Sequence, residues 1–255
     1  MSRIEKAFDN KKAFIGYVMG GDPNLEKTEE FIMRLIDAGT DLVEIGVPFS
    51  DPIAEGPVIQ RANIRALAVN TRLKDLFGLV ARLRLKTDTP FVFLTYLNPV
   101  FRYGYDRFFE KCAQSGVDGV IIPDLPFEEQ EEVLELSKKR DVDLISLVAP
   151  TSQERIKKIA ERASGFLYMV SSMGVTGLRR EIKTDLAGMA RLAKSVTDIP
   201  VAIGFGVHTP RQAKEMSEIA DGVIIGSAIV KLIEEHGEKA GDILYNYAKN
   251  IKRSM

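Results

Sequence analysis

Apolar residues in this chain gather in eight short runs, separated by longer amphipathic stretches. The runs are of strand length and rich in Val, Ile and Phe, and several end in Gly, Pro, Ser or Asp, as buried strands do. Between them, the segments 25–38, 127–139 and 152–163 show the spacing of helices, with Gly39 as a stop signal and Ser152 as an N-cap. The runs begin at Ala13, Leu42, Phe91, Gly119, Asp143, Gly165, Val201 and Gly222.

This alternation of strand and helix predicts an α/β protein whose parallel sheet is covered by helices. Eight such units without a Gly- or Ser-rich linker favour one domain over residues 1–255, a single (β/α)8 TIM barrel. We expect an extra short charged helix at the N-terminus and a short extra helix, 228–235, after the eighth strand. An open doubly wound sheet is the competing architecture, but the first run is not followed by the Gly-rich dinucleotide fingerprint of that fold.

The composition and charge of the chain indicate which kinds of partner and which cellular compartment to expect. Of the 255 residues, 45% are hydrophobic and 28% charged, and the net charge of −1 gives no reason to expect nucleic acid or an anionic membrane as partner. No stretch is long and apolar enough to cross a bilayer. One cysteine precludes an internal disulfide, and with only two histidines we expect no metal site and a cytoplasmic location.

Glu44 is the residue that folding alone explains least, because it lies within the apolar run of LVEIGVPFSDPIAEGP. Alternation along the strand places Val43 and Ile45 toward the covering helices, so the Glu44 carboxyl should point into the barrel. Burial there should raise its pKa and leave a group that holds or donates a proton near neutrality. A structural ion pair is the alternative, but no predicted strand supplies the arginine that it would need.

The eight runs contain no lysine and no histidine. A Schiff-base aldolase requires a desolvated lysine, and a metal-dependent epimerase requires clustered histidine and carboxylate ligands, so both enzyme classes are disfavoured. In TIM barrels the chemistry lies in the loops after the carboxyl ends of the strands. Three of these loops are long or rich in Gly and Pro, at 48–57, 98–104 and 171–180.

Glycines after the seventh and eighth runs predict a phosphate site. Gly206 follows the seventh run, and Gly226 with Ser227 follows the eighth, the usual position of phosphate in these barrels. Glycine allows backbone N–H groups to approach an anion, and the helix that follows Ser227 adds a favourable dipole.

The motifs VEIGVPFSDPIAEGPVIQ, YVMGGDP, GVTG, GFGV and GSAIVK together resemble the alpha subunit of tryptophan synthase, and the resemblance covers essentially the whole chain. It implies reversible cleavage of indole-3-glycerol phosphate to indole and glyceraldehyde 3-phosphate, without a cofactor in this subunit. It also implies a complex of two alpha and two beta chains, in which indole passes to a beta subunit that carries pyridoxal phosphate.

The resemblance also implies residue roles. Glu44 corresponds to the acid/base group that protonates indole C3, and Glu55 stands where the family has an aspartate that stabilises positive charge at the indole nitrogen. The extra methylene of Glu55 moves its carboxylate by roughly 1 Å, a distance that matters for an oriented group. Tyr168 matches an active-site tyrosine, and Tyr17, counted with the substrate-binding residues, stands where phenylalanine is common. By the same correspondence Thr176 and Gly177 belong to the loop over the substrate, Gly206, Gly226 and Ser227 to the phosphate site, and Asp51, Pro52, Asn98 and Pro126 to the face that meets the beta subunit.

Two other functions stay open at this stage. One is a different enzyme on the same barrel, such as a sugar-phosphate isomerase or indole-glycerol-phosphate synthase, which would normally show a strand lysine or a different acid pair. The other is a phosphate-ligand-binding barrel that acts mainly as an allosteric activator of the beta subunit, its own chemistry weakened by Glu55.

Overall fold

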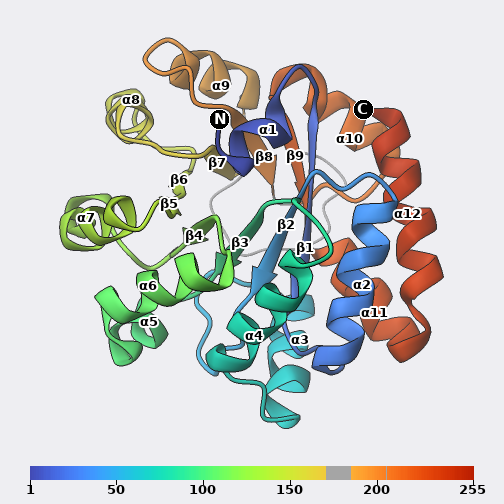
Figure 1. Ribbon diagram of the computed structural model, residues 1–255. Helices are drawn as coiled ribbons and strands as arrows, with labels where there is room; N and C mark the ends of the chain where they lie inside the picture. Colours follow the sequence, from blue (N-terminus) through green and yellow to red (C-terminus); the bar gives the residue numbers. More distant parts are fainter. Residues whose placement is uncertain (171–184, 205) are drawn as a thin grey trace.

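The strands form one parallel sheet that closes on itself (Figure 1). The computed structural model describes residues 1–170, 185–204 and 206–255. Across them the strand order is β5-β4-β3-β2-β1-β9-β8-β7-β6, and every neighbouring pair is parallel. The strands are β1 (Ala13–Met19), β2 (Leu42–Gly46), β3 (Phe91–Leu94), β4 (Gly119–Ile121), β5 (Asp143–Leu144), β6 (Ser146–Val148), β7 (Leu167–Val170), β8 (Val201–Gly204) and β9 (Gly222–Ile225).

The two ends of this order are halves of one segment, since only Ile145 separates β5 from β6. β5 pairs with β4 and β6 pairs with β7, so this segment closes the barrel by changing partner partway along its length. The predicted (β/α)8 barrel is therefore confirmed, with its fifth strand interrupted once.

Helices follow the strands and cover the outside of the barrel (Figure 1). The predicted helices are present, except that the segment 127–139 is divided at Gln130 into a short 3-10 helix and an α-helix. Ser152 caps its helix by accepting a hydrogen bond from the Arg155 N–H at 3.3 Å. The helical elements are α1 (Arg3–Phe8), α2 (Leu25–Asp37), α3 (Pro57–Ala68), α4 (Leu73–Arg84), α5 (Leu97–Tyr103), α6 (Tyr105–Ser115), η1 (Phe127–Glu129), α7 (Glu131–Lys139), α8 (Gln153–Glu161), α9 (Leu186–Lys194), α10 (Pro210–Ile219), α11 (Ser227–His236), η2 (Gly237–Lys239) and α12 (Gly241–Ser254).

The prediction of a loop at 98–104 was wrong, because this segment forms α5. Pro99 lies in the first turn of the helix, where its missing N–H is not needed. The Leu97 N–H at the start of α5 donates to the Asp124 carboxylate at 2.8 Å. Gly104, with a φ of 90°, ends the helix and begins α6.

The two faces of the sheet have different neighbours. Val43 and Ile45 point outward into the core that the helices cover, whereas Leu42 belongs to a separate cluster inside the barrel. Ile4 and Phe8 of α1 join this inner cluster, and the Phe8 and Phe166 ring centroids lie 5.7 Å apart. Apolar side chains therefore fill the amino-terminal end of the barrel.

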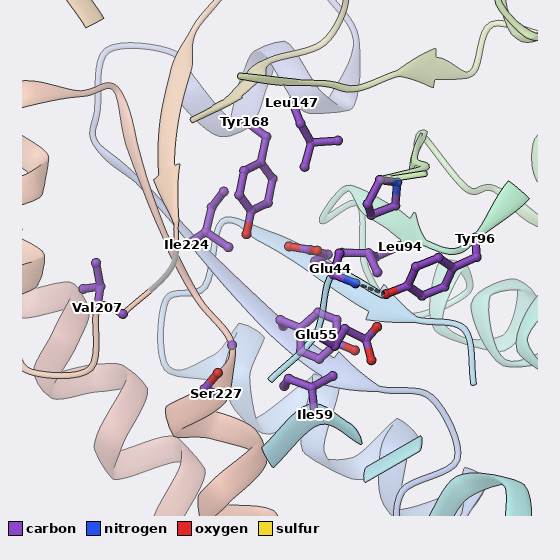
Figure 2. A pocket seen from close by; sticks show the side chains of 15 residues that line it. Glu44, Glu55, Ile59, Leu94, Tyr96, Leu147, Tyr168, Val207, Ile224 and Ser227 are labelled. Atoms are coloured by element: carbon purple, nitrogen blue, oxygen red, sulfur yellow. Dashed lines mark hydrogen bonds between the residues drawn. The ribbon is translucent and has the colours of Figure 1, made fainter. Parts of the chain in front are cut away.

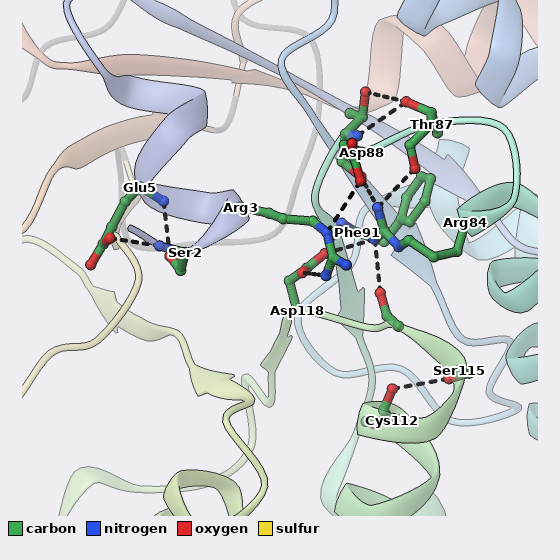
Figure 3. A network of polar contacts seen from close by, with 12 residues as sticks. Ser2, Arg3, Glu5, Arg84, Thr87, Asp88, Phe91, Cys112, Ser115 and Asp118 are labelled. Atoms are coloured by element: carbon green, nitrogen blue, oxygen red, sulfur yellow. Dashed lines mark hydrogen bonds and ion pairs between the residues drawn. The ribbon is translucent and has the colours of Figure 1, made fainter.

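A polar network fastens that same end (Figure 3). The Arg84 guanidinium donates to the carbonyl oxygens of Thr87, Thr89 and Gly116 and to the Asp118 carboxylate. Asp118 also accepts from Arg3 at 2.9 Å, which ties α1 to the end of α4 and the start of β4. These contacts stabilise the amino-terminal end of the barrel. In TIM barrels the active site usually lies at the opposite end.

Among the described helices, none is long and apolar enough to span a membrane.

Candidate active site

A cavity opens at the carboxyl ends of the strands (Figure 2). It holds about 700 Å³ of empty space, part of it open to solvent. Its walls are mostly apolar, with two carboxyl groups, three tyrosines and a glycine-rich rim. The lining residues are Tyr17, Glu44, Ala54, Glu55, Ile59, Leu94, Tyr96, Pro123, Leu147, Tyr168, Gly206, Val207, Ile224, Gly226 and Ser227.

Glu44 lies on β2 with its carboxyl group in the cavity, on the inner side of the barrel as the alternation predicted. Its side chain is 1% exposed, and Oε2 has no hydrogen-bond partner among the described residues. Burial raises the pKa of Glu44 to about 8, and the nearby Glu55 carboxylate contributes in the same direction. The group is therefore protonated at neutral pH and close to the point where it can lose that proton.

Glu55 lies in the segment between β2 and α3 and is also buried, at 5% exposure. The Asn63 side-chain amide donates to Glu55 Oε2 at 2.5 Å. Burial raises the pKa of Glu55 to about 7, and hydrogen bonds with Asn63 and Tyr96 pull it back toward its ordinary value. The longer side chain thus reaches the same cavity as Glu44 and is not a solvated surface group.

Asn63 is a site residue that sequence reasoning missed. It is 2% exposed, accepts from the Phe49 N–H at 2.8 Å and donates to the Ile59 carbonyl at 3.1 Å in addition to Glu55. It therefore connects both ends of the β2–α3 segment to α3. A signal was available, because Asn63 is the one polar member of the buried face of α3, which otherwise consists of Ile59, Ala62 and Ala66.

Tyr96 was likewise not proposed as a site residue. Its hydroxyl accepts from the Ala54 N–H at 3.2 Å, beside Glu55, and its ring stacks on Phe49 at 5.1 Å between centroids. Burial is the largest of the causes that raise the pKa of Tyr96, so its hydroxyl stays neutral. A polar ring at the end of the third strand was the signal in the sequence.

Tyr17 on β1 and Tyr168 on β7 place two further hydroxyls at the cavity. Figure 2 shows Tyr168 on its wall. Glycines make the space for the two hydroxyls. A Cβ at Gly46 would lie 2.1 Å from the Tyr17 hydroxyl, and one at Gly204 would lie 2.6 Å from the Tyr168 hydroxyl. Burial raises the pKa of both tyrosines well above the ordinary value, with further increases from Glu55 and Glu44 at Tyr17 and from Glu44 at Tyr168.

The predicted phosphate residues come together at one side of the cavity. Gly206, after β8, and Gly226 with Ser227, after β9, line the same wall. Gly206 has a φ of 90°, a conformation that favours glycine. Helix α11 begins at Ser227, so its amino end, where N–H groups lack helical partners, lies at the cavity.

The remaining predicted residues lie elsewhere. Asp51, Asn98 and Pro126 are exposed and Pro52 is half-buried, and none of the four lines the cavity. Thr176 and Gly177 fall outside the described residues. Within the described ranges, no cluster of three or more His, Cys, Asp or Glu side chains could hold a metal ion.

Comparisons with known proteins agree with this geometry. A family model described as tryptophan synthase alpha chain matches residues 4–254. Proteins of that name from Lacticaseibacillus casei and Lactiplantibacillus plantarum are each 48% identical, over 252 and 256 residues. These matches cover 99% and 100% of this chain, and 95% and 97% of the relatives.

Solved structures give the same result. Tryptophan synthase subunit alpha from Legionella pneumophila is 35% identical, with a TM-score of 0.89, over 100% of this chain and 98% of the other. The tryptophan synthase α2β2 complex from Pyrococcus furiosus contributes a chain that is 35% identical, with a TM-score of 0.86, over 94% of this chain and 97% of that one. The chain therefore belongs to the tryptophan synthase alpha chain family, whose alpha subunit is a lyase that cleaves indole-3-glycerol phosphate in tryptophan biosynthesis.

Proposed function

We propose that this chain cleaves indole-3-glycerol phosphate with Glu44 as the group that moves protons and Glu55 as the anion that faces the indole nitrogen. One observation carries the proposal. Two buried carboxyl groups share a cavity with a glycine-rich wall, and burial has displaced their pKa values to about 8 and about 7. When the environment gives two neighbouring acids different pKa values, the one with the higher pKa can act as a proton donor while the other is an anion.

The reaction needs a proton at indole C3 before the carbon–carbon bond can break. Glu44 is protonated below a pH of about 8 and donates its proton to C3, which turns the ring into an electron sink. The electron pair of the bond between C3 and the glycerol chain then moves into the ring. The hydroxyl on the departing carbon becomes an aldehyde and returns its proton to the Glu44 carboxylate, so the enzyme ends as it began.

Glu55 acts while positive charge develops on the ring. Above a pH of about 7 it is an anion and can accept the indole N–H, which stabilises that charge. Asn63 and Tyr96 orient the carboxylate through the hydrogen bonds described above. The extra methylene relative to the family aspartate is accommodated because Glu55 remains within the cavity.

The other groups bind and orient. The Tyr168 hydroxyl points toward Glu44 and stays neutral, so it can hold the substrate without competing for the proton (Figure 2). Gly206, Gly226 and Ser227 form the subsite for the phosphate group. Thr176 and Gly177 are assigned to the loop over the substrate on the family resemblance alone.

The partner is a beta subunit, in a complex of two alpha and two beta chains, as the solved complex of the Pyrococcus furiosus relative supports. The contact face is formed by residues that are exposed or half-buried outside the cavity, namely Asp51, Pro52, Asn98 and Pro126.

No cofactor acts in this subunit, and pyridoxal phosphate belongs to the partner. We place the protein in the cytoplasm, where a chain with a single cysteine remains reduced.

Steady-state cleavage of indole-3-glycerol phosphate tests the proposal. We expect the isolated chain to release indole slowly and added beta subunit to raise the rate, because a partner on the contact face shifts the population of a closed site. Glu44→Gln should bind the substrate and lose activity by several powers of ten, since an amide cannot shuttle a proton. A wild type that activates the beta subunit but releases no indole would support the activator-only alternative, and near-normal turnover by Glu44→Gln would remove Glu44 from the mechanism.

A further inference from the structure

Tyr17 carries a buried hydroxyl with no hydrogen-bond partner among the described residues. Tyr17 is 5% exposed and lines the cavity. Glu44 Oε2, in the same cavity, is likewise buried and without a hydrogen-bond partner among the described residues. A buried polar atom without a partner costs free energy, and nearly all such atoms in proteins are paired. Two unpaired polar atoms facing one cavity therefore indicate that a ligand supplies their partners.

The position of Tyr17 shows which part of the ligand is concerned. In the sheet register Tyr17 on β1 stands level with Glu44 on β2. On the other side of β1, Gly16 pairs with Ile225 of β9, so the next residue, Tyr17, stands level with Gly226. The two residues are close, since a Cβ added at Gly226 would lie 3.3 Å from the Tyr17 Cβ. Three neighbouring strands thus place the proton donor, the tyrosine and the phosphate wall in one row.

The substrate has the same sequence of parts. A three-carbon chain with two hydroxyl groups connects its indole ring to its phosphate. Neighbouring strands are about 4.8 Å apart, so the row from Glu44 to Gly226 spans about 10 Å at the backbone. A ligand whose ring contacts Glu44 and whose phosphate contacts Gly226 and Ser227 lays its glycerol chain along β1. The Tyr17 ring reaches from β1 to Gly46 of β2, so its hydroxyl lies on the Glu44 side of this row, where the chain joins the indole ring.

We propose that the Tyr17 hydroxyl hydrogen-bonds to a hydroxyl group of the glycerol chain and so selects the hydroxylated substrate. This inference rests on the proposed function and deepens it, because it gives Tyr17 a specificity-determining role that a phenylalanine could not fill.

Two features fit this role. Gly46 leaves room for the hydroxyl, since a Cβ there would lie 2.1 Å from the oxygen and 2.7 Å from the ring carbon that bears it. Burial, Glu55 and Glu44 together keep the phenol protonated, so it is available as a donor. A substrate hydroxyl that accepts from Tyr17 can in turn donate to the unprotonated oxygen of the Glu44 carboxyl group, so that one hydroxyl pairs with both residues.

Tyr17→Phe tests the proposal with two ligands. The first is indole-3-glycerol phosphate, and the second is 3-indolylpropyl phosphate, which keeps the ring and the phosphate but lacks both hydroxyls. We expect kcat/KM for the substrate to fall about tenfold, the usual effect of losing one hydrogen bond, and Kd for the deoxy ligand to stay within about twofold. In the reverse condensation, KM should rise for glyceraldehyde 3-phosphate and stay unchanged for indole. Tyr245→Phe, on the outer helix α12, removes a tyrosine hydroxyl away from the cavity and serves as the matched control.

Other results would overturn the inference. Equal losses for the substrate and the deoxy ligand would mean that Tyr17 acts through the shape of the cavity, and a rise in KM for indole alone would place the hydroxyl at the ring. Without ligand, Tyr17→Phe should melt no lower than the wild type, because it removes an unpaired buried hydroxyl; a lower melting temperature would reveal a structural partner instead. If the wild type does not cleave the substrate, the proposed function itself is wrong. That result comes from the wild type alone, so it is distinguishable from a failure of the Tyr17 inference, which appears only in the comparison with Tyr17→Phe.

Discussion

At the scale of single residues, what surrounds each carboxyl group decides its protonation. Glu44 has a carboxyl oxygen without a partner among the described residues, whereas Glu55 receives hydrogen bonds from Asn63 and Tyr96. Alternation along one strand was enough to predict that Glu44 points inward. The hydrogen bond from Asn63 was not predictable in the same way, because it joins residues eight positions apart across a turn of the chain.

The separation of the two pKa values predicts a bell-shaped pH profile of kcat/KM. Activity requires Glu55 ionised and Glu44 protonated, so the acid limb should lie near a pH of about 7 and the alkaline limb near about 8. Initial rates with the isolated chain between pH 5.5 and 9.5, sampled at about half-unit steps, measure both limbs. A profile that stays flat across this range would contradict the assignment of the two carboxyl groups.

Asn63→Ala should shift the acid limb. The amide donates to the ionised form of Glu55, so its removal raises the Glu55 pKa and moves that limb to higher pH while the alkaline limb stays in place. We also expect kcat to fall by about tenfold even at the optimum, because the carboxylate is less well oriented. Asn246→Ala makes the same change at an exposed position of α12, away from the cavity, and is the control. Loss of activity without any shift of the acid limb would indicate that Asn63 only supports the fold.

At the scale of elements, the pattern of the sequence identified the strands more completely than what lies between them. All eight predicted runs form strands, because a buried parallel strand has a continuous apolar signature. The break at Ile145 was not predictable, since it arises where the chain exchanges one neighbouring strand for another. Helix α5 was missed because Pro99 suggests a loop unless the position of the first turn is already known.

The amino end of α11 leads to a prediction about the phosphate subsite. Ser227→Asp should leave stability unchanged or slightly higher, because an acidic group suits the first turn of a helix. The same charge should weaken binding of glycerol 3-phosphate by about tenfold or more, through repulsion of the phosphate. Calorimetric titration measures the affinity, and Ser152→Asp makes the same change at the start of α8, away from the cavity. Equal affinities for Ser227→Asp and the wild type would place the anion site elsewhere.

At the scale of the whole molecule, the barrel separates stability from function along its axis. Arg84 and Asp118 cross-link the amino-terminal end, while the carboxyl-terminal end holds the cavity with its two carboxyl groups. The number of βα units predicted closure of the sheet, because eight such units suit a barrel of this length. The cross-links were not predictable, since Arg84, Asp118 and Arg3 come from three separate segments that only the closed barrel brings together.

The cavity should also impose a pH dependence on the stability of the whole protein. Glu44 has a pKa of about 8 in the folded chain and an ordinary value near 4.5 in the unfolded chain, so the folded state holds the proton more tightly. The stabilisation that the Glu44 proton contributes is complete below the lower pKa and is lost progressively as pH rises toward the higher one. The total loss is roughly 5 kcal/mol in the free energy of unfolding. Glu44→Gln cannot ionise and lacks this loss.

Urea unfolding of the wild type and Glu44→Gln, at several pH values from 5 to 9, measures the effect. We expect the stability of the variant relative to the wild type to rise steadily with pH between about 4.5 and 8 and then to level off, whatever fixed cost the amide carries. Glu154→Gln, at an exposed position in the first turn of α8, should follow the wild-type curve. Parallel curves for the wild type and Glu44→Gln would mean that Glu44 ionises in the folded protein as it does in the unfolded chain. A carboxyl group of that kind would be an anion at neutral pH, with no proton to give to the indole ring.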